Sequence, residues 1–450
     1  MVTALPPPPG PRSPIPGGQM LAFRRDPIGL LTRLSHTYGD VVRYRLGAER
    51  ITLLSHPGDI QEVMVSQQRN FTKSRALQWA KFLLGEGLLT SEGELHVRQR
   101  RLAQPAFQRQ RVPAYGASMV ATTQRLQQRW QDGEHRAIDH EMSHLTLAIA
   151  SKTLFDTDVE AEAQAIGTAL TTVLDLFPRF MLPLYNLIAK LPLPSNRRAA
   201  QATHLLDTIV YRMIRERRAR STESGDLLSM LLAARDEEGD GSGMSDQQLR
   251  DEVMTLLLAG HETTAMLLTW TWYLLAHNPE AEAQLHAELD TVLGGRLPTV
   301  DDMPRLPYTR MVLAETLRLY PPAWIIGRRT IEAYEVGGYA LPAQAIVVMS
   351  PYLTQRDARF FSDPAAFQPQ RWTPALEAAL PKFAYFPFGG GARQCIGESF
   401  AWMEGTLALA TLAQQWQMRL VPHHRVALKP QLTLRPKYGM RMIVQRRSGH

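Results

Sequence analysis

The 450-residue sequence has a single cysteine, Cys395, so no disulfide can form within the chain. This excludes the disulfide-rich class of small secreted domains and fits a reducing compartment, so we expect a cytoplasmic protein. The N-terminus also lacks the charged and apolar regions of a secretory signal peptide. Apolar residues make up 44% and charged residues 21%, which excludes collagen-like and disordered chains.

Long uninterrupted apolar runs are scarce. The longest, residues 256–276, has the length of a bilayer span, but it contains His261 and Glu262. Because a charged side chain in lipid is expensive, we expect a buried helix and no membrane span.

A large excess of one charge is also missing. Fifty Lys and Arg against 43 Asp and Glu give a net charge of +7, which is modest for this length. The arginines are scattered, and local groups such as Arg98, Arg100 and Arg101 are typical of solvated helix faces. We therefore expect no nucleic-acid partner.

The pattern along the chain favours helix, with a small strand component. Residues 1–19 form a proline-rich lead-in, which prolines 6–9 stiffen, and residues 20–450 form one domain. Helices are predicted at 27–38, after Pro57, widely between 93 and 220, from a capping box at Ser245 and Gln248 to about His277, and up to Tyr320. A hairpin is predicted over residues 42–53, short strands over 334–348, and alternating segments near the C-terminus.

The surroundings of Cys395 are unusual. A lone cysteine is more often a small buried hydrophobe. Here glycines 389–391 predict a tight loop that lets the backbone pass close to a flat cofactor. The apolar run after Gly397 predicts a helix whose N-terminal amides favour a thiolate, and Arg393 adds positive charge. The context indicates a thiolate that binds a metal.

This segment resembles the haem-binding signature of the cytochromes P450 at five fixed positions: Phe388, Gly391, Arg393, Cys395 and Gly397. The resemblance extends from about Phe23 to the C-terminus. It implies the mainly α cytochrome P450 fold with a small β region. It also implies haem b as cofactor, with Cys395 as the axial iron ligand whose thiolate favours O–O cleavage.

Residues 259–264, AGHETT, resemble the oxygen-binding part of the family's long central helix. Burying Glu262 and Thr263 in mid-helix costs free energy unless they have partners or work, and Gly260 costs about 1 kcal/mol relative to Ala. The alternative is that these are polar residues without a function in a core helix. By resemblance, Gly260 leaves room for dioxygen, and Thr263 and Glu262 organise water and protons.

A second motif, Glu315-x-x-Arg318, places two opposite charges on one helix face. On its own this pattern is common and weak. The downstream segment FQPQRW, residues 367–372, matches the part of the family whose arginine, here Arg371, completes a buried ion network. By resemblance all three residues are structural. Gln355 stands where many members have His, and we attach no chemistry to it.

Residues 93–101 resemble the family's propionate-binding helix. His96 and Arg100 are four residues apart, so both could reach one carboxylate. A surface position for His96 is the alternative. Arg328 falls where the family places a further propionate-binding arginine.

The resemblance implies a monooxygenase that inserts one atom of O2 into an organic substrate. We expect the electrons to come from NAD(P)H through a separate reductase and a ferredoxin or flavodoxin, because no fused reductase follows residue 450. Basic residues such as Arg98 and Arg101 would suit an acidic partner of this kind. The rival hypotheses are a hydrogen-peroxide-driven peroxygenase, against which Glu262 and Thr263 argue, and a non-catalytic haem-thiolate protein that only binds a ligand.

Substrate identity is less determined. By family position the pocket includes Ala259, Ala323, Ile325, Ile326 and Tyr438. The largely apolar set favours a lipophilic substrate such as a fatty acid, terpenoid, steroid or carotenoid. Residues 173–191 are either an access lid or a core helix surface.

Overall fold

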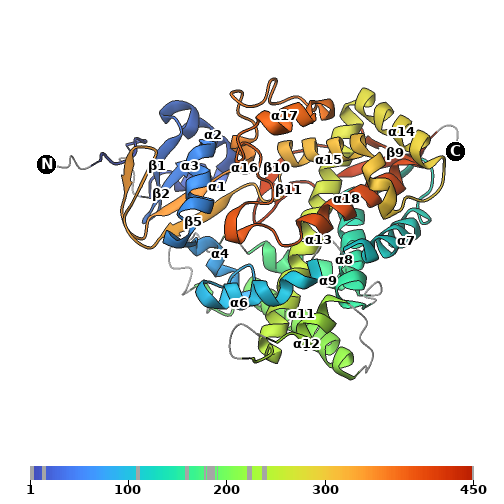
Figure 1. The fold of residues 1–450 in the computed structure, drawn as a ribbon, viewed down its shortest axis with the longest axis horizontal. Coiled ribbons are helices and arrows are strands. Elements are labelled where there is room, and N and C mark those ends of the chain that lie inside the picture. Colours follow the sequence, from blue (N-terminus) through green and yellow to red (C-terminus); the bar gives the residue numbers. More distant parts are fainter. Residues whose placement is uncertain are drawn as a thin grey trace.

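The computed structural model describes residues 5–12, 17–107, 112–157, 162–176, 179, 188–189, 191–219, 226–235 and 241–447. In these residues the chain is mainly helical with small sheets, which confirms the predicted fold class. The main sheet lies on the side of the molecule nearest the N-terminus, and the helices fill the rest (Figure 1).

The longer helices are α2 (Pro27–Tyr38), α6 (Gly93–Ala103), α7 (Gly116–Gln127), α8 (Ile138–Phe155), α9 (Ala163–Leu174), α11 (Pro194–Ala219), α13 (Asp246–His277), α14 (Pro279–Leu293), α15 (Pro307–Leu319) and α18 (Glu398–Ala413). The shorter ones are α1 (Met20–Arg25), α3 (Pro57–Gln61), α4 (Arg75–Trp79), α5 (Lys81–Leu84), α12 (Leu227–Ala233), α16 (Pro351–Thr354) and α17 (Pro374–Ala379). No helix of the described chain is both long and apolar enough to cross a membrane.

Helix α13 is the centre of the helical part, and it begins as predicted. The Ser245 hydroxyl accepts a hydrogen bond from the Gln248 amide at 3.2 Å, and the Gln248 side chain accepts one from the Ser245 amide at 3.0 Å. The helix packs against α8, α15 and α18. Near its end the Trp270 ring stacks on Tyr320, and its Nε1 donates to the Leu434 carbonyl, which ties α13 to the C-terminal strands.

The main sheet has the strand order β1-β2-β8-β5-β3, made of β1 (Val41–Leu46), β2 (Glu49–Leu54), β8 (Ile346–Met349), β5 (Ile326–Thr330) and β3 (Phe71–Lys73). The predicted hairpin is β1–β2, with Val41 opposite Leu54. Strand β5 was not predicted, because its sequence IGRRT has no apolar alternation. Pairing with β3 and β8 on both sides makes it a strand.

The remaining strands form small sheets: β4 (Glu134–Ala137) with β12 (Arg441–Arg446) and β9 (Trp416–Leu420), β6 (Tyr334–Val336) with β7 (Tyr339–Leu341), and β10 (Leu428–Pro430) with β11 (Leu434–Pro436).

Part of the proline-rich lead-in lies along the main sheet. The Pro9 carbonyl accepts a hydrogen bond from the Arg43 amide at 2.7 Å, and the Pro6 carbonyl accepts one from the Ala340 amide at 3.1 Å. A Cβ on Gly10 would lie 1.7 Å from the Arg43 carbonyl oxygen, so the segment sits closer to β1 than any residue with a side chain allows. Residues 6–10 thus contact the domain.

The apolar segment 173–191 begins at the end of α9. Most of it, residues 177–178, 180–187 and 190, lies outside the described chain. Its interpretation as an access lid stays a prediction.

The contact between α8 and α13 contains a buried histidine. His261 is 1% exposed, and its Nε2 lies 2.9 Å from the Ser143 hydroxyl on α8. The Thr146 hydroxyl on α8 donates to the His261 carbonyl at 2.9 Å. Burial lowers the pKa of the His261 imidazole to about 4, so the folded protein keeps it neutral.

We expect this histidine to make stability depend on acid. The unfolded chain binds a proton near pH 6.5 and the folded chain only near pH 4, so stability is lost as pH falls through that window, by up to about 3 kcal/mol. The His261→Gln variant should show a shallower fall in unfolding free energy between pH 6.5 and 4.5, measured by denaturant titration. The control is His277→Gln, at the exposed end of the same helix. Equal slopes in all three proteins would contradict the assignment.

Candidate active site

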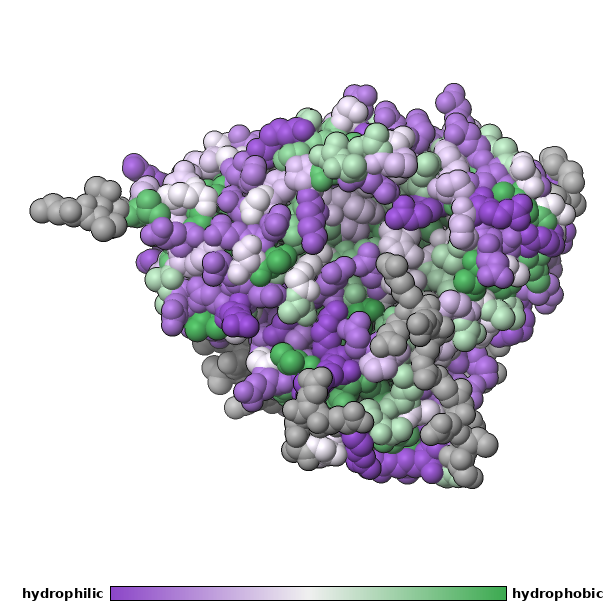
Figure 2. Space-filling view, in the orientation of Figure 1, coloured by the Kyte–Doolittle hydropathy of each residue, from purple (hydrophilic) through white to green (hydrophobic). Residues whose placement is uncertain are grey.

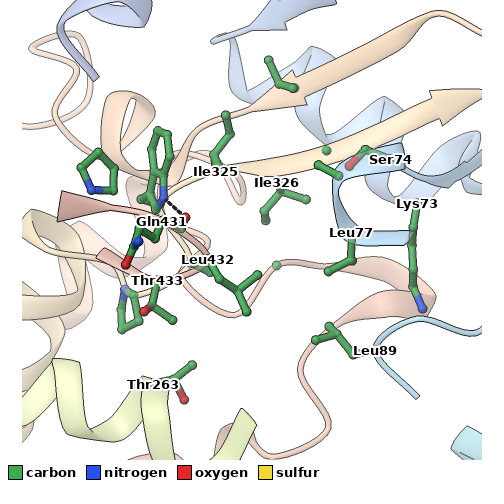
Figure 3. Close-up of a pocket in the computed structure, with 18 of the residues that line it drawn as sticks. Lys73, Ser74, Leu77, Leu89, Thr263, Ile325, Ile326, Gln431, Leu432 and Thr433 are labelled. Carbon is green, nitrogen blue, oxygen red and sulfur yellow. Dashed lines mark hydrogen bonds between the residues drawn. The ribbon is translucent and has the colours of Figure 1, made fainter. Parts of the chain in front are cut away.

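A cavity of about 1310 Å³ lies where α13, the main sheet, β10–β11 and the Cys395 loop meet. Its wall includes Cys395 on one side and Gly260, Glu262 and Thr263 of α13 on another. Figure 3 shows Thr263 on the α13 side, facing a space that is bordered by Ile325, Ile326 and Leu432. The cavity therefore joins two of the sequence motifs that are far apart along the chain.

Cys395 lies deep in the protein, yet its side chain is exposed, because it opens onto this cavity. Burial raises the pKa of the thiol to about 11, while the Gly397 amide and the Arg100 charge act in the opposite direction. The expected help from Arg393 is absent, since its guanidinium donates to the Ser91 carbonyl at 3.0 Å and to Glu92 at 2.5 Å. The thiolate thus depends on a cation that binds it.

The glycines of the cysteine loop have two different functions. Gly389 has φ +69° and lines the cavity, where its missing side chain leaves space, as predicted for a loop that passes a flat group. Gly391 has φ +67°, and a Cβ there would lie 2.0 Å from the Met64 carbonyl. Gly391 is therefore required by packing against the residue 62–66 helix and not by the cavity. Phe388 and Gly397 also line the cavity.

On the opposite wall, the Thr263 hydroxyl donates to the Ala259 carbonyl at 2.7 Å. A Cβ on Gly260 would meet nothing closer than Leu154 at 3.8 Å and Ala150 at 3.9 Å, so packing does not demand glycine there. Gly260 lines the cavity, and its missing side chain leaves room next to Thr263.

Glu262 also lines the cavity, but both of its oxygens are engaged. Arg435 of β11 donates to them through Nε and Nη2, each at 2.6 Å, and the Thr433 hydroxyl donates to Oε1 at 2.7 Å. Arg435 and Thr433 were not predicted, because nothing in the motif indicates which distant strand faces this helix. Any proton transfer by Glu262 must begin from this ion pair.

Basic side chains gather at another part of the wall, where Lys73, Arg328 and Arg393 all line the cavity. Burial, with the nearby charge of Arg393, lowers the pKa of Lys73 to about 7 and that of Arg328 to about 10. Glu92 is the nearest acid to this cluster. Buried like charges need an anionic partner, and the two propionates of a bound haem would supply that charge.

The cavity thus has three features that fit haem. Its thiol is open to the cavity, a glycine leaves space for a flat group, and a cationic cluster lines the wall. Lys73 was not predicted, because a single lysine at the end of a short strand carries no recognisable pattern.

The two residues predicted on the propionate helix are placed differently. His96 is buried, with Nδ1 3.1 Å from the Leu88 carbonyl, and it is not among the residues that line the cavity. Arg100 lies on the other side of the cysteine loop, where it donates to the Gln394 carbonyl at 2.8 Å. The two side chains therefore do not line one cavity, and their contact with a propionate stays a prediction.

The three structural residues come together in one buried network. Arg318 donates to both oxygens of Glu315 at 2.8 and 2.7 Å, and Arg371 Nε donates to Glu315 Oε1 at 2.9 Å. Trp372 Nε1 and the Gln368 amide also donate to Glu315. The remaining N–H groups of Arg318 bind three backbone carbonyls, those of Gln355, Pro364 and Ala366. The carboxylate therefore fixes the chain that leads to the cysteine loop.

Gln355, to which we attached no chemistry, is a connecting residue. Its Nε2 donates to the Leu317 and Arg318 carbonyls at 2.9 and 3.1 Å, and its Oε1 accepts from the Phe386 amide at 3.0 Å. It is fully buried. One amide thus joins the end of α15 to the segment just before Phe388.

Most of the predicted substrate-pocket residues line the cavity: Ala259, Ala323, Ile325 and Ile326. Tyr438 does not. Its ring is 45% exposed and contacts the cations of Arg425 and Lys437, so the prediction for this residue is wrong.

A second depression, of about 570 Å³, lies on the outer side of Cys395. Arg100, Arg310, Gln394 and Trp402 line it. Figure 2 shows strongly hydrophilic residues over the nearby helix α6. Of the basic residues expected there, Arg98 donates to the Ser242 and Gly243 carbonyls at 3.1 Å. Cys395 therefore also borders a polar, partly basic depression.

Comparison with known proteins places this geometry in a family context. The family model for Cytochrome P450 matches residues 7–443. The chain is 43% identical to "Cyclooctatin synthase" of Streptomyces melanosporofaciens, over 93% of this chain and 91% of the relative. It is 40% identical to "Cyclooctat-9-en-7-ol 5-monooxygenase" of the same organism, over 90% and 88%. It is 38% identical to "Pentalenene oxygenase" of Streptomyces avermitilis, over 93% and 91%.

Among solved structures, the cytochrome P450DA heme domain is similar, with a TM-score of 0.89 and 27% sequence identity over 99% of both chains.

We expect Gln355 to stabilise the cysteine loop. Gln355→Leu leaves the Phe386 amide and the α15 carbonyls without a partner, which should lower the free energy of unfolding by about 2–4 kcal/mol. It should also lower the fraction of protein that shows the thiolate band of the reduced carbon monoxide complex. Gln201→Leu, on the exposed face of α11, is the matched control. Unchanged stability and an unchanged thiolate fraction in Gln355→Leu would remove this role.

Proposed function

The chain belongs to the cytochrome P450 family, and we propose that this haem-thiolate oxidoreductase is a monooxygenase that hydroxylates a terpenoid with O2. The main support is that Thr263 of α13 and Cys395 line the same, largely apolar cavity. The names of three relatives, which concern cyclooctatin, cyclooctat-9-en-7-ol and pentalenene, support a terpenoid over a fatty acid, steroid or carotenoid.

The residues for the cofactor follow from the fit described above. Cys395 would ligate the iron of haem b, and Lys73, Arg328 and Arg393 would bind its propionates. When bound, the haem supplies the activation of O2 and the oxidation of the substrate. A bound cation also favours the Cys395 thiolate, whose pKa burial alone raises to about 11.

The chain itself supplies orientation and protons. Apolar side chains such as Ile325, Ile326 and Leu432 bind a lipophilic substrate and exclude water. The Thr263 hydroxyl, next to the space left by Gly260, holds a proton at Oγ1 for the distal side of the cavity. Glu262 is the adjacent residue and lines the same cavity, and its exchange between Arg435 and the cavity would renew that proton.

We propose that electrons arrive at the depression behind Cys395. Arg100 and Arg310 line this surface together with Glu398, and Arg310 also pairs with Glu377 at 3.1 Å. The two arginines support an acidic ferredoxin or flavodoxin, reduced through an NAD(P)H-dependent reductase. The single cysteine, which has to stay reduced, supports a cytoplasmic location.

The proposed substrate class is tested by optical titration of the purified ferric protein with terpenes, fatty acids, steroids and carotenoids. We expect cyclic terpenoids to shift the haem to high spin, because they fill the cavity and exclude water. A shift with another class alone would replace the terpenoid assignment. A shift with no class, in a protein that keeps its thiolate band, would discard all four.

The proton role is tested by Thr263→Ala, with a surrogate ferredoxin and reductase. We expect NAD(P)H oxidation to continue while product per NAD(P)H falls roughly tenfold or more, since the hydroxyl that holds the proton is lost. The control is Thr269→Ala, which removes the same kind of hydroxyl-to-carbonyl hydrogen bond at a buried position of the same helix. Unchanged coupling in Thr263→Ala, with full product formation from hydrogen peroxide alone, would favour a peroxygenase.

A further inference from the structure

Ser74, at the junction of β3 and α4, has an unusual position for a polar side chain. It is 6% exposed and lines the cavity. It occupies the N-cap of α4, where a serine hydroxyl normally accepts a hydrogen bond from the first turn. Here the side chain makes no cap bond, and the backbone carbonyl of Ser74 accepts from the Leu77 and Gln78 amides in its place.

The backbone holds this hydroxyl in position. The Ser74 amide donates to the Gly327 carbonyl of β5 at 3.3 Å, and a Cβ on Gly327 would lie 2.5 Å from the Ser74 Oγ. The missing side chain at Gly327 thus makes the space that Ser74 occupies. In the described chain the hydroxyl has no hydrogen-bond partner, so one donor and two acceptor sites remain free.

The other polar side chains in the close-up of this wall have protein partners, apart from the Gln431 Oε1, which is buried without one in the described chain. Lys73 donates to the Leu88 and Ser91 carbonyls. Thr433 donates to Glu262, Thr263 to Ala259, and the Gln431 amide nitrogen to Asp175 at 3.2 Å.

The neighbours of Ser74 in the cavity include the apolar side chains of Leu77 and Ile326 and the cationic side chain of Lys73 (Figure 3). A hydroxyl that borders the cavity without a protein partner is available to a ligand, and a ligand that pairs with it gains a hydrogen bond.

We propose that Ser74 binds a hydroxyl group that the substrate already carries, so that the substrate is a terpene alcohol and not the parent hydrocarbon. This inference rests on the proposed function and names the substrate class of the same cavity. The name of one relative, "Cyclooctat-9-en-7-ol 5-monooxygenase", describes an enzyme that acts on an alcohol.

The placement of Ser74 also has a regiochemical consequence. In Figure 3, Ser74 and Thr263 lie on opposite sides of the cavity. An alcohol anchored at Ser74 therefore presents its far end to the reaction side, and the new hydroxyl is introduced away from the existing one. The substrate must come from an earlier reaction that leaves an alcohol, either a cyclisation ended by water or a previous hydroxylation.

The experiment compares the affinities of hydrocarbon and alcohol pairs for the haem-loaded protein by spin-state titration. The probes are cedrane with cedrol, abietatriene with dehydroabietinol, and pinane with its secondary and tertiary alcohols, so that the hydroxyl takes several positions. We expect at least one alcohol to bind roughly three- to tenfold more tightly than its hydrocarbon, the range for one neutral hydrogen bond. In Ser74→Ala this ratio should fall to about one.

Leu77→Ala is the matched control, because it enlarges the apolar wall beside Ser74 and should weaken both members of a pair while the ratio stays. Hydrocarbons that bind as well as every alcohol, or a ratio that survives in Ser74→Ala, would overturn the inference and leave the proposed function intact. Failure of all terpenoids to bind would overturn both.

A last measurement tests whether Ser74 binds a haem propionate and not the substrate. Ser74→Ala that speeds the transfer of haem to apomyoglobin, with the alcohol ratio unchanged, would assign the hydroxyl to a propionate and overturn the inference. An unchanged rate of haem transfer together with a lost ratio supports it.

Discussion

The buried carboxylate of Glu315 is the interaction on which the active-site geometry depends. It accepts hydrogen bonds from Arg318, Arg371, Trp372 and the Gln368 amide, and it has no contact with water. Removing one member of such a network leaves a charge buried without a partner, which is far more costly than the net value of the pair. The segment between α15 and the cysteine loop is therefore held in one arrangement.

A chain of hydrogen bonds connects Glu315 and Arg318 to the cysteine loop at the cavity. Arg318 binds the carbonyl of Gln355, and Gln355 binds the amide of Phe386, two residues before the first position of the cysteine motif. The loop then places Cys395 against a space that also holds three cations, Lys73, Arg328 and Arg393. The thiol has a raised pKa, and the three cations have only Glu92 as a close acidic partner, so an anionic cofactor that binds the thiolate would balance both.

The cavity wall combines two kinds of selection. Its large apolar area binds lipophilic molecules with little discrimination, because a methylene more or less changes the binding free energy only slightly. A single hydroxyl that lacks a protein partner discriminates more sharply, since a ligand without a matching group leaves it unpaired. The Ser74 hydroxyl is such a group. The Glu262 carboxylate is not, because it already accepts hydrogen bonds from Arg435 and Thr433.

The sequence by itself determined the elements with strong local signals. The capping box of α13, the β1–β2 hairpin, the spacing around Cys395 and the Glu315–Arg318 pair all depend on residues close together in the chain. Tertiary structure alone decided the rest. Strand β5 exists because β3 and β8 flank it, Arg435 meets Glu262 from a distant strand, Arg100 lies on the outer side of the cysteine loop, and Tyr438 turns outward. Contacts between distant segments depend on how whole elements pack, and a residue's own neighbours in sequence carry no record of that packing.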